Sequence, residues 1–245
     1  MPAWLQKFAD DFVTCFIVKD RWKYIVQGLG NTLKIALCAV LIGVAIGIVV
    51  AIVRSTYDKN IKDMRPGVGR LLLKIGNGIC KLYVTVIRGT PVMIQILIMF
   101  FVIFSSVRNG VPVAMLTFGI NSGAYVAEII RGGIMAVDEG QMEAGRSLGF
   151  NYVQTMWYIV IPQALKSVLP ALANEFISLL KETSVACYVA VNDLTKGGEI
   201  IRSTTYIQAL PLLIVALIYL IMVIFFSRMV GKLERRLRSG ERSVN

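Results

Sequence analysis

The sequence lacks the residues on which several classes of protein depend. It has no histidine, and its four cysteines are scattered without a CxxC pair, so we expect neither a metal site nor a disulfide framework. It has no GxxxxGK[ST] motif, so we expect no ATP chemistry and no catalytic residues in this chain. The short apolar stretch FVTCFIV, bounded by Asp11 and Lys19, is too brief and too acidic at its front for a signal peptide.

Charged residues are also scarce. They make up 17% of the 245 residues, against about 25% in soluble domains, and 56% of the chain is hydrophobic. This composition indicates a protein whose solvent is lipid. The net charge is +11, but without a soluble domain to carry a basic face we expect no binding of nucleic acid.

Long uncharged runs predict membrane-spanning helices, because a helix needs about 20 apolar residues to cross a bilayer. The four runs are Ile35 to Val53, Gly89 to Val107, Asn109 to Ala127 and Ser203 to Ser227. A fifth segment, about 163–190, is mostly apolar but carries four charges, so we expect it to face other helices rather than lipid. The sequence therefore predicts an all-α membrane protein with five transmembrane helices.

The lysine and arginine residues predict the orientation of these spans. With five spans, segments 54–88, 131–146 and 228–242 share one side and hold 16 of them, whereas the other side holds seven and three lie within spans. By the positive-inside rule the C-terminus is cytoplasmic and the N-terminus lies outside. We expect residues 66–88 to form an amphipathic stretch on the cytoplasmic side, which enters the membrane at an angle before RGTP (88–91) redirects the chain. Pro91 fits a helix start or a kink at this point. The predicted parts are an outer interfacial amphipathic segment (1–28), a transmembrane domain (29–235) and a basic cytoplasmic tail (236–245).

A polar, glycine-containing stretch at 140–163, GQMEAGRSLGFNYVQTMWYIVIPQ, interrupts the apolar pattern. It predicts a short helix over Gln141 to Leu148, ended by Gly149 as a C-cap glycine. A second helix would be capped by Asn151 and run to Pro162. The two helices would form a cytoplasmic elbow over about 136–162, in which another group can approach the backbone of Gly145 closely. From the residues alone, an ordinary loop and a docking surface remain equally open.

Polar residues inside the predicted spans are candidates for contacts with a transported molecule, because such residues are costly in a membrane and often functional. They fall on shared helix faces through spacings of three, four and seven residues. The candidates are Asn174, Glu175, Ser178, Lys181 and Glu182 in segment 163–190, then Asn121, Tyr125 and Glu128, and more weakly Gln95 and Thr117. A structural role is the alternative, in which Glu175 pairs with Lys181 or Arg131 to hold helices together.

The elbow resembles the EAA loop of ABC importer membrane subunits. The shared pattern runs from Glu143 and Ala144 through Gly149 to the sequence IVIP at 159–162, with Gly145 in place of the second alanine. Four further stretches match the polar amino-acid permeases in order: GLGNTLKIAL (28–37), VIRGTPVMIQ (86–95), GAYVAEIIRGGI (123–134) and LLKETSVA (179–186). The chain is therefore identified as similar, over about residues 28–235, to the histidine, glutamine, glutamate and arginine uptake group.

This resemblance implies a type I ABC importer permease-like fold in the bacterial cytoplasmic membrane. The elbow would be the coupling helix, with Glu143, Ala144, Gly145 and Gly149 as contacts to the ATPase. The implied partners are two ATP-binding subunits, a second permease copy or a homologue, and an extracytoplasmic amino-acid-binding protein. The chain itself would bind no cofactor, because ATP and Mg would be held by the partner ATPase.

The polar stripes would then bind a polar amino acid, with carboxylates for its ammonium group and donors for its carboxylate. The excess of carboxylates over amines slightly favours a cationic substrate such as arginine, lysine or histidine. Glutamine, glutamate or another small solute is the alternative within the family. Three other functions also remain open: a channel, a secondary transporter, and a subunit that assists assembly without binding substrate. The elbow argues against a channel, which has no reason to present it. The sequence shows no internal repeat of the kind found in many secondary transporters, which argues against that class.

Overall fold

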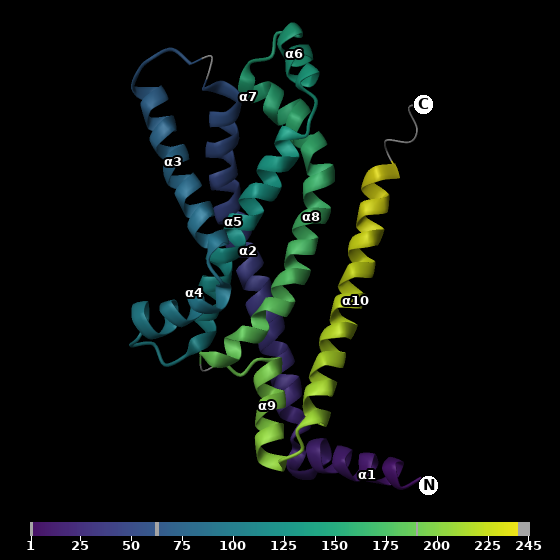
Figure 1. The fold of residues 1–245 in the computed structure, drawn as a ribbon. Helices are drawn as coiled ribbons and strands as arrows, with labels where there is room; N and C mark the ends of the chain where they lie inside the picture. The colour runs from purple at the N-terminus through teal and green to yellow at the C-terminus, as the bar shows by residue number, and fades with distance from the viewer. Residues whose placement is uncertain (1, 62–63, 190, 240–245) are drawn as a thin grey trace. The chain divides into compact units, whose positions relative to one another are not determined.

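The computed structural model describes residues 2–61, 64–189 and 191–239, and every regular element in these ranges is a helix (Figure 1). The helices are α1 (Ala3–Phe12), α2 (Trp22–Asn60), α3 (Val68–Gly89), α4 (Val92–Ile98), α5 (Gly110–Met135), α6 (Glu139–Ser147), α7 (Tyr152–Thr155), α8 (Ile161–Glu182), α9 (Leu194–Thr205) and α10 (Ala209–Ser239), with the short π or 3-10 helices η1 (Val13–Ile17), η2 (Val18–Asp20), η3 (Met99–Ile103), η4 (Met156–Val160) and η5 (Thr183–Tyr188). Some residues that the predictions include lie outside these described ranges: Met1, Lys62, Ala190 and the tail residues 240–245.

Four helical stretches are long and apolar enough to cross a membrane. They are Trp22–Asn60, Gly110–Met135, Tyr152–Tyr188 and Ala209–Leu237. Four of the five predicted spans are thereby confirmed in type and approximate place. The first long helix begins at Trp22, so it includes the last residues of the predicted interfacial segment 1–28.

The predicted span from Gly89 to Val107 is wrong as a single helix. α3 ends at Gly89, and the helical stretch Val92–Ile103 starts after it at an angle of 104°. Pro91 explains the break, because a proline disfavours the helical conformation of the residue before it, and Thr90 is extended with φ −119° and ψ 143°. The bent pair of α3 and 92–103 brings the number of candidate spans to five when it is taken as one span.

The chain divides into two compact units, and each long spanning helix contributes to both. Unit 1 consists of residues 1–39, 91–118 and 177–226, and unit 2 consists of residues 40–90, 119–176 and 227–245. The core of unit 1 is formed where η1, α9 and the first parts of α2 and α10 meet. Its buried members are Cys15, Phe16, Ile25, Leu194, Ile201, Leu210 and Val215.

Asp193 holds the start of α9 in unit 1. Its fully buried side chain caps the helix by accepting hydrogen bonds from the backbone N–H groups of Thr195 and Lys196, both at 3.0 Å. Thr32 of α2 accepts a hydrogen bond from the backbone N–H of Leu194 at 3.1 Å, which ties α9 to α2. Burial raises the pKa of the Asp193 carboxyl above its ordinary value, although the backbone hydrogen bonds oppose this shift.

Unit 2 contains two apolar clusters. In the first, Val50 of α2 and Val84 of α3 pack against Ala124 and Ala127 of α5. In the second, Ile134 near the end of α5 packs against Val160, the last residue of η4, and Ala164 of α8. Small residues let α2 and α5 approach closely, as is common between helices in membranes, since a Cβ on Gly43 would lie 2.9 Å from the Ser122 side chain.

Candidate functional site

The elbow predicted from the sequence is present in unit 2 as α6, a turn and α7 (Figure 1). Gly149 has φ +82°, a left-handed conformation that favours glycine, so its predicted role in ending the first helix is confirmed. Asn151 caps α7 as predicted, in a capping box in which Asn151 and Gln154 exchange side-chain hydrogen bonds of 2.9 Å with each other's backbone. The turn is therefore fixed by its own residues.

The predicted end of the second helix at Pro162 is wrong. α7 continues without interruption through η4 into α8, which ends at Glu182. Pro162 is the second residue of α8 and follows the π-helical turn Met156–Val160, where the regular hydrogen-bond pattern is already displaced. A proline at this point therefore removes less than it would inside a regular helix. The elbow is thus joined rigidly to a spanning helix.

Gly145 is the point where α6 and α7 touch. It is buried, and a Cβ at this position would lie 2.5 Å from Cγ2 and 2.8 Å from Oγ1 of Thr155. The close approach predicted from the sequence is confirmed. Thr155 is fully buried, and its hydroxyl donates a hydrogen bond of 3.0 Å to the backbone carbonyl of Asn151, so it cannot turn away easily.

The surface of the elbow carries the other predicted coupling residues. Glu143, Ala144 and Gly149 are exposed, whereas Gly145 faces Thr155 inside the elbow. Large apolar side chains are exposed around them: Leu148, Val153, Trp157 and Tyr158 are each at least 66% exposed. An exposed apolar patch of this kind is typical of a surface that binds another protein.

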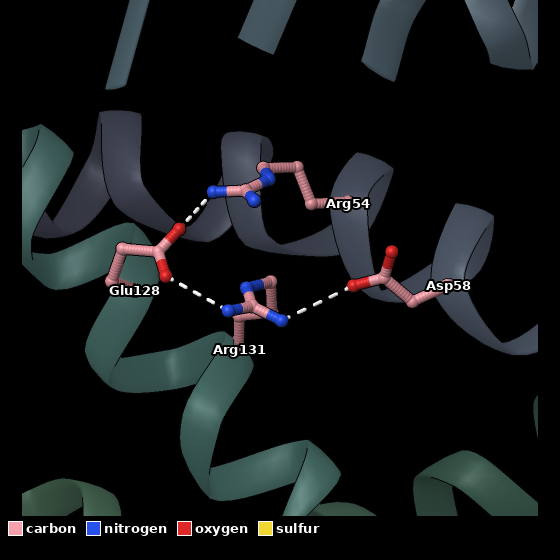
Figure 2. A network of polar contacts seen from close by, with 4 residues as sticks. All are labelled: Arg54, Asp58, Glu128 and Arg131. Atoms are coloured by element: carbon pink, nitrogen blue, oxygen red, sulfur yellow. Dashed lines mark hydrogen bonds and ion pairs between the residues drawn. The ribbon is translucent and has the colours of Figure 1, made fainter. Parts of the chain in front are cut away.

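A network of four charged side chains connects α2 and α5 in unit 2 (Figure 2). Glu128 accepts hydrogen bonds from Arg54 and, at 2.9 Å, from Arg131, and Arg131 also contacts Asp58 at 3.2 Å. The side chains are between 16% and 32% exposed, so the pairs are largely shielded from solvent. Two positive and two negative charges balance one another. This geometry favours a structural role for Glu128, which the sequence analysis treated as a candidate substrate contact.

Glu175 has a different environment. Its carboxylate accepts a hydrogen bond of 2.9 Å from the hydroxyl of Ser122 on α5. In the part of the chain that the structure describes, neither Lys181 nor Arg131 forms an ion pair with it, so the ion pairs considered from the sequence are not formed. A carboxylate in a spanning helix that has only a hydroxyl as partner suits a cationic ligand group.

Arg88 lies near these candidates and was not among them. Its guanidinium lies 5.0 Å from the centre of the Tyr125 ring. A cavity of about 250 Å³ next to it is lined by Arg54, Lys81, Val84, Thr85, Arg88 and Glu128. The sequence analysis counted Arg88 only as a charge that sets orientation. Arg88 belongs to the RGTP motif, directly before the bend between α3 and α4. This position was the signal that the sequence analysis did not use.

The remaining candidates are divided between the two units. Asn121, Tyr125, Glu128, Asn174 and Glu175 belong to unit 2, and Gln95, Thr117, Ser178, Lys181 and Glu182 belong to unit 1. Thr117 donates its hydroxyl to the backbone carbonyl of Val113 in its own helix at 2.7 Å, which is a local role. Asn121 is buried and Asn174 is exposed. Among the described residues, no three potential metal ligands gather in one place.

Comparisons with known proteins give a consistent picture. Residues 67–239 match the family described as binding-protein-dependent transport system inner membrane component. The arginine transport system permease protein ArtQ of Bacillus subtilis is 33% identical over 221 residues, which cover 89% of this chain and 94% of the relative. The putative glutamine transport system permease protein GlnP of Rickettsia bellii is 34% identical over 217 residues, 87% of this chain and 93% of the relative. A crystal structure of an amino acid ABC transporter with histidines superposes with a TM-score of 0.78 at 38% identity, covering 90% of this chain and 98% of that one.

Proposed function

Because the chain belongs to the family of binding-protein-dependent transport system inner membrane components, as a permease subunit of an amino-acid ABC importer, we propose that it carries a cationic amino acid such as arginine or histidine. It is a multi-pass protein of the inner membrane, and it works with an ATPase on separate chains and with a substrate-binding protein. Glutamine is the alternative substrate, since a glutamine permease is a similarly close relative.

The proposed substrate site lies in unit 2, around Glu175, Ser122 and Tyr125. Glu175 binds an ammonium or guanidinium group of the substrate, because no basic side chain in the described residues pairs with it. Arg88, which lies over Tyr125, binds the carboxylate of the substrate. The single observation that supports this assignment best is that the Glu175 carboxylate, within a spanning helix, accepts a hydrogen bond from the Ser122 hydroxyl and forms no ion pair with any described residue.

We propose that the elbow transmits the conformational change of the ATPase to the permease. Glu143, Ala144 and Gly149 would contact the ATPase together with the exposed apolar side chains of α6, α7 and η4. Since α7 runs continuously into α8, which carries Glu175, a displacement of the elbow would reach the substrate site through one helix. ATP and Mg would be bound by the ATPase, a second permease copy or homologue would complete the pathway, and the C-terminus would be cytoplasmic with the N-terminus outside.

The test is the ATPase activity of the purified permease–ATPase assembly in lipid, with its cognate binding protein, measured across the twenty amino acids. We expect arginine, lysine or histidine to stimulate it most. The Glu175→Gln variant, which keeps the shape and removes the charge, should raise the half-saturating concentration by about 10- to 150-fold, because a hydrogen bond to a charged group contributes about 1.5–3 kcal/mol.

The matched control is Glu199→Gln, which removes a carboxylate from a half-exposed pair with Arg202 on α9. It should leave stimulation within about twofold of the wild type, because such surface pairs contribute about 0–1 kcal/mol. If Glu175→Gln weakens only the cationic amino acids, Glu175 binds the substrate side chain; if it weakens all of them, it binds the α-ammonium group. Unchanged half-saturation for every amino acid would refute the proposed site.

A further inference from the structure

α3 presents three chemically distinct faces along its length. One face packs against α2 and α5 in unit 2 through Cys80, Tyr83, Val84 and Ile87. A second face is apolar and exposed, with residues at spacings of three and four: Val68, Leu71, Leu72, Ile75, Ile79, Leu82 and Val86. The third face is basic, because Arg70, Lys74, Lys81 and Arg88 fall on one side of the helix at spacings of four and seven. The basic face thus runs beside an apolar face suited to acyl chains.

At the start of α3 the basic face borders a cavity of about 340 Å³. The cavity is lined by Tyr57, Ile61, Pro66, Gly67, Arg70, Leu71 and Lys74. Arg70 and Lys74 stand one helical turn apart on α3, and Tyr57 of α2 also lines the cavity. Ile61 and Leu71 make the rest of the lining apolar. The cavity therefore combines two positive charges with an apolar wall.

The described lining of this cavity contains no carboxylate. Asp58, the neighbour of Tyr57, is already paired with Arg131 in the network of Figure 2. Among residues 2–61, 64–189 and 191–239, neither Arg70 nor Lys74 forms an ion pair or a side-chain hydrogen bond. Two cations in one partly apolar cavity favour an anionic ligand with an apolar part.

We propose that this cavity binds the phosphate of an anionic phospholipid headgroup, with the acyl chains lying along the exposed apolar face of α3. The place of the cavity fits this ligand, because it lies where the apolar helix α2 ends at Asn60 and α3 begins at Val68. A soluble anion would need the two charges but not the apolar face. The site is separate from the proposed substrate site and does not depend on it.

The experiment measures lipid retention by native mass spectrometry on the detergent-solubilised permease–ATPase assembly, titrated with phosphatidylglycerol or with phosphatidylcholine. We expect the wild type to retain phosphatidylglycerol in preference to phosphatidylcholine. The variant Arg70→Gln/Lys74→Gln should weaken the affinity for phosphatidylglycerol by at least about 10-fold, since it removes the charge-assisted hydrogen bonds that the two cations would donate directly to the phosphate. The charge-retaining variant Arg70→Lys/Lys74→Arg should bind within about threefold of the wild type, as a phosphate can be bound by either cation.

The matched control is Arg228→Gln/Lys232→Gln, an exposed pair of the same two residue types at the same spacing on α10. It removes the same charge away from the cavity and should change the affinity by less than about twofold. Thermal unfolding without phosphatidylglycerol checks that the variants are folded, and added phosphatidylglycerol should raise the unfolding temperature of the wild type but not of the Arg70→Gln/Lys74→Gln variant.

Equal losses of affinity from both glutamine pairs would show diffuse attraction and overturn the proposal. Displacement of phosphatidylglycerol by equimolar inorganic phosphate would assign the site to soluble phosphate instead, and unchanged retention in the cavity variant would exclude the site.

Discussion

Gly145 in the elbow offers a sharp test of the packing between α6 and α7. In the Gly145→Ala variant the new Cβ would lie 2.5 Å from Cγ2 and 2.8 Å from Oγ1 of Thr155, about 1 Å too close to the carbon for an ordinary contact. Thr155 is fully buried and its hydroxyl is bonded to the carbonyl of Asn151, so one of the two helices must move. Overpacking of this kind costs about 1–3 kcal/mol.

Two measurements follow from this geometry. The thermal unfolding temperature should fall by about 2–4 °C for each kcal/mol lost, and stimulation of the ATPase by substrate should decrease because the elbow changes shape. The double variant Gly145→Ala/Thr155→Ala removes both close contacts and should recover most of the stability lost through Gly145→Ala. Gly132→Ala is the matched control, since a Cβ at this helical position would meet nothing within 4 Å. A Gly145→Ala variant as stable and as well coupled as the wild type would refute the account of the elbow.

Three further predictions concern stability. Glu128→Gln leaves the guanidinium groups of Arg54 and Arg131 without their shared carboxylate and should cost about 1–3 kcal/mol, seen as a lower unfolding temperature in detergent; no loss would mean that the network of Figure 2 is not formed. Burial raises the pKa of Asp193, so the folded state binds more protons than the unfolded state, and stability should fall as the pH rises from about 4 through the raised pKa. Asp193→Asn should remove that part of the pH dependence, and an unchanged profile would contradict the assignment. Asn151→Ala removes the cap of α7 and should cost about 1 kcal/mol, measured by chemical unfolding, whereas an equally stable variant would show that the cap is unimportant.

The sequence was sufficient for features that depend on local chemistry. Three long uncharged runs and the mostly apolar segment 163–190 predicted the four long spanning helices, because length and hydropathy alone decide whether a helix can cross a membrane. The turn of the elbow was predicted because Gly149 and Asn151 act through their own backbone conformation and their own hydrogen bonds. These effects need no information about distant parts of the chain.

Features that depend on neighbours were missed. The uncharged run starting at Gly89 was predicted as one span from its charges, although Pro91 was expected to start or kink a helix; the helices on the two sides of Thr90 and Pro91 meet at 104°. The pairing of Glu128 with Arg54, 74 residues earlier, could not be read from spacing within one helix. For the same reason Ser122 as the partner of Glu175 was not foreseen. Spacing predicts which residues share a helix face, but not which helix that face meets.

The central claim is that this chain is the amino-acid pathway of an ATP-driven importer. The most direct test is uptake of labelled arginine into liposomes that contain the permease–ATPase assembly, with the binding protein on one side and ATP on the other. The account predicts uptake that requires both ATP hydrolysis and the binding protein, and that stops in an elbow variant which no longer binds the ATPase. Uptake of any amino acid that continues without ATP, or that follows an ion gradient alone, would contradict the account and favour a channel or a secondary transporter.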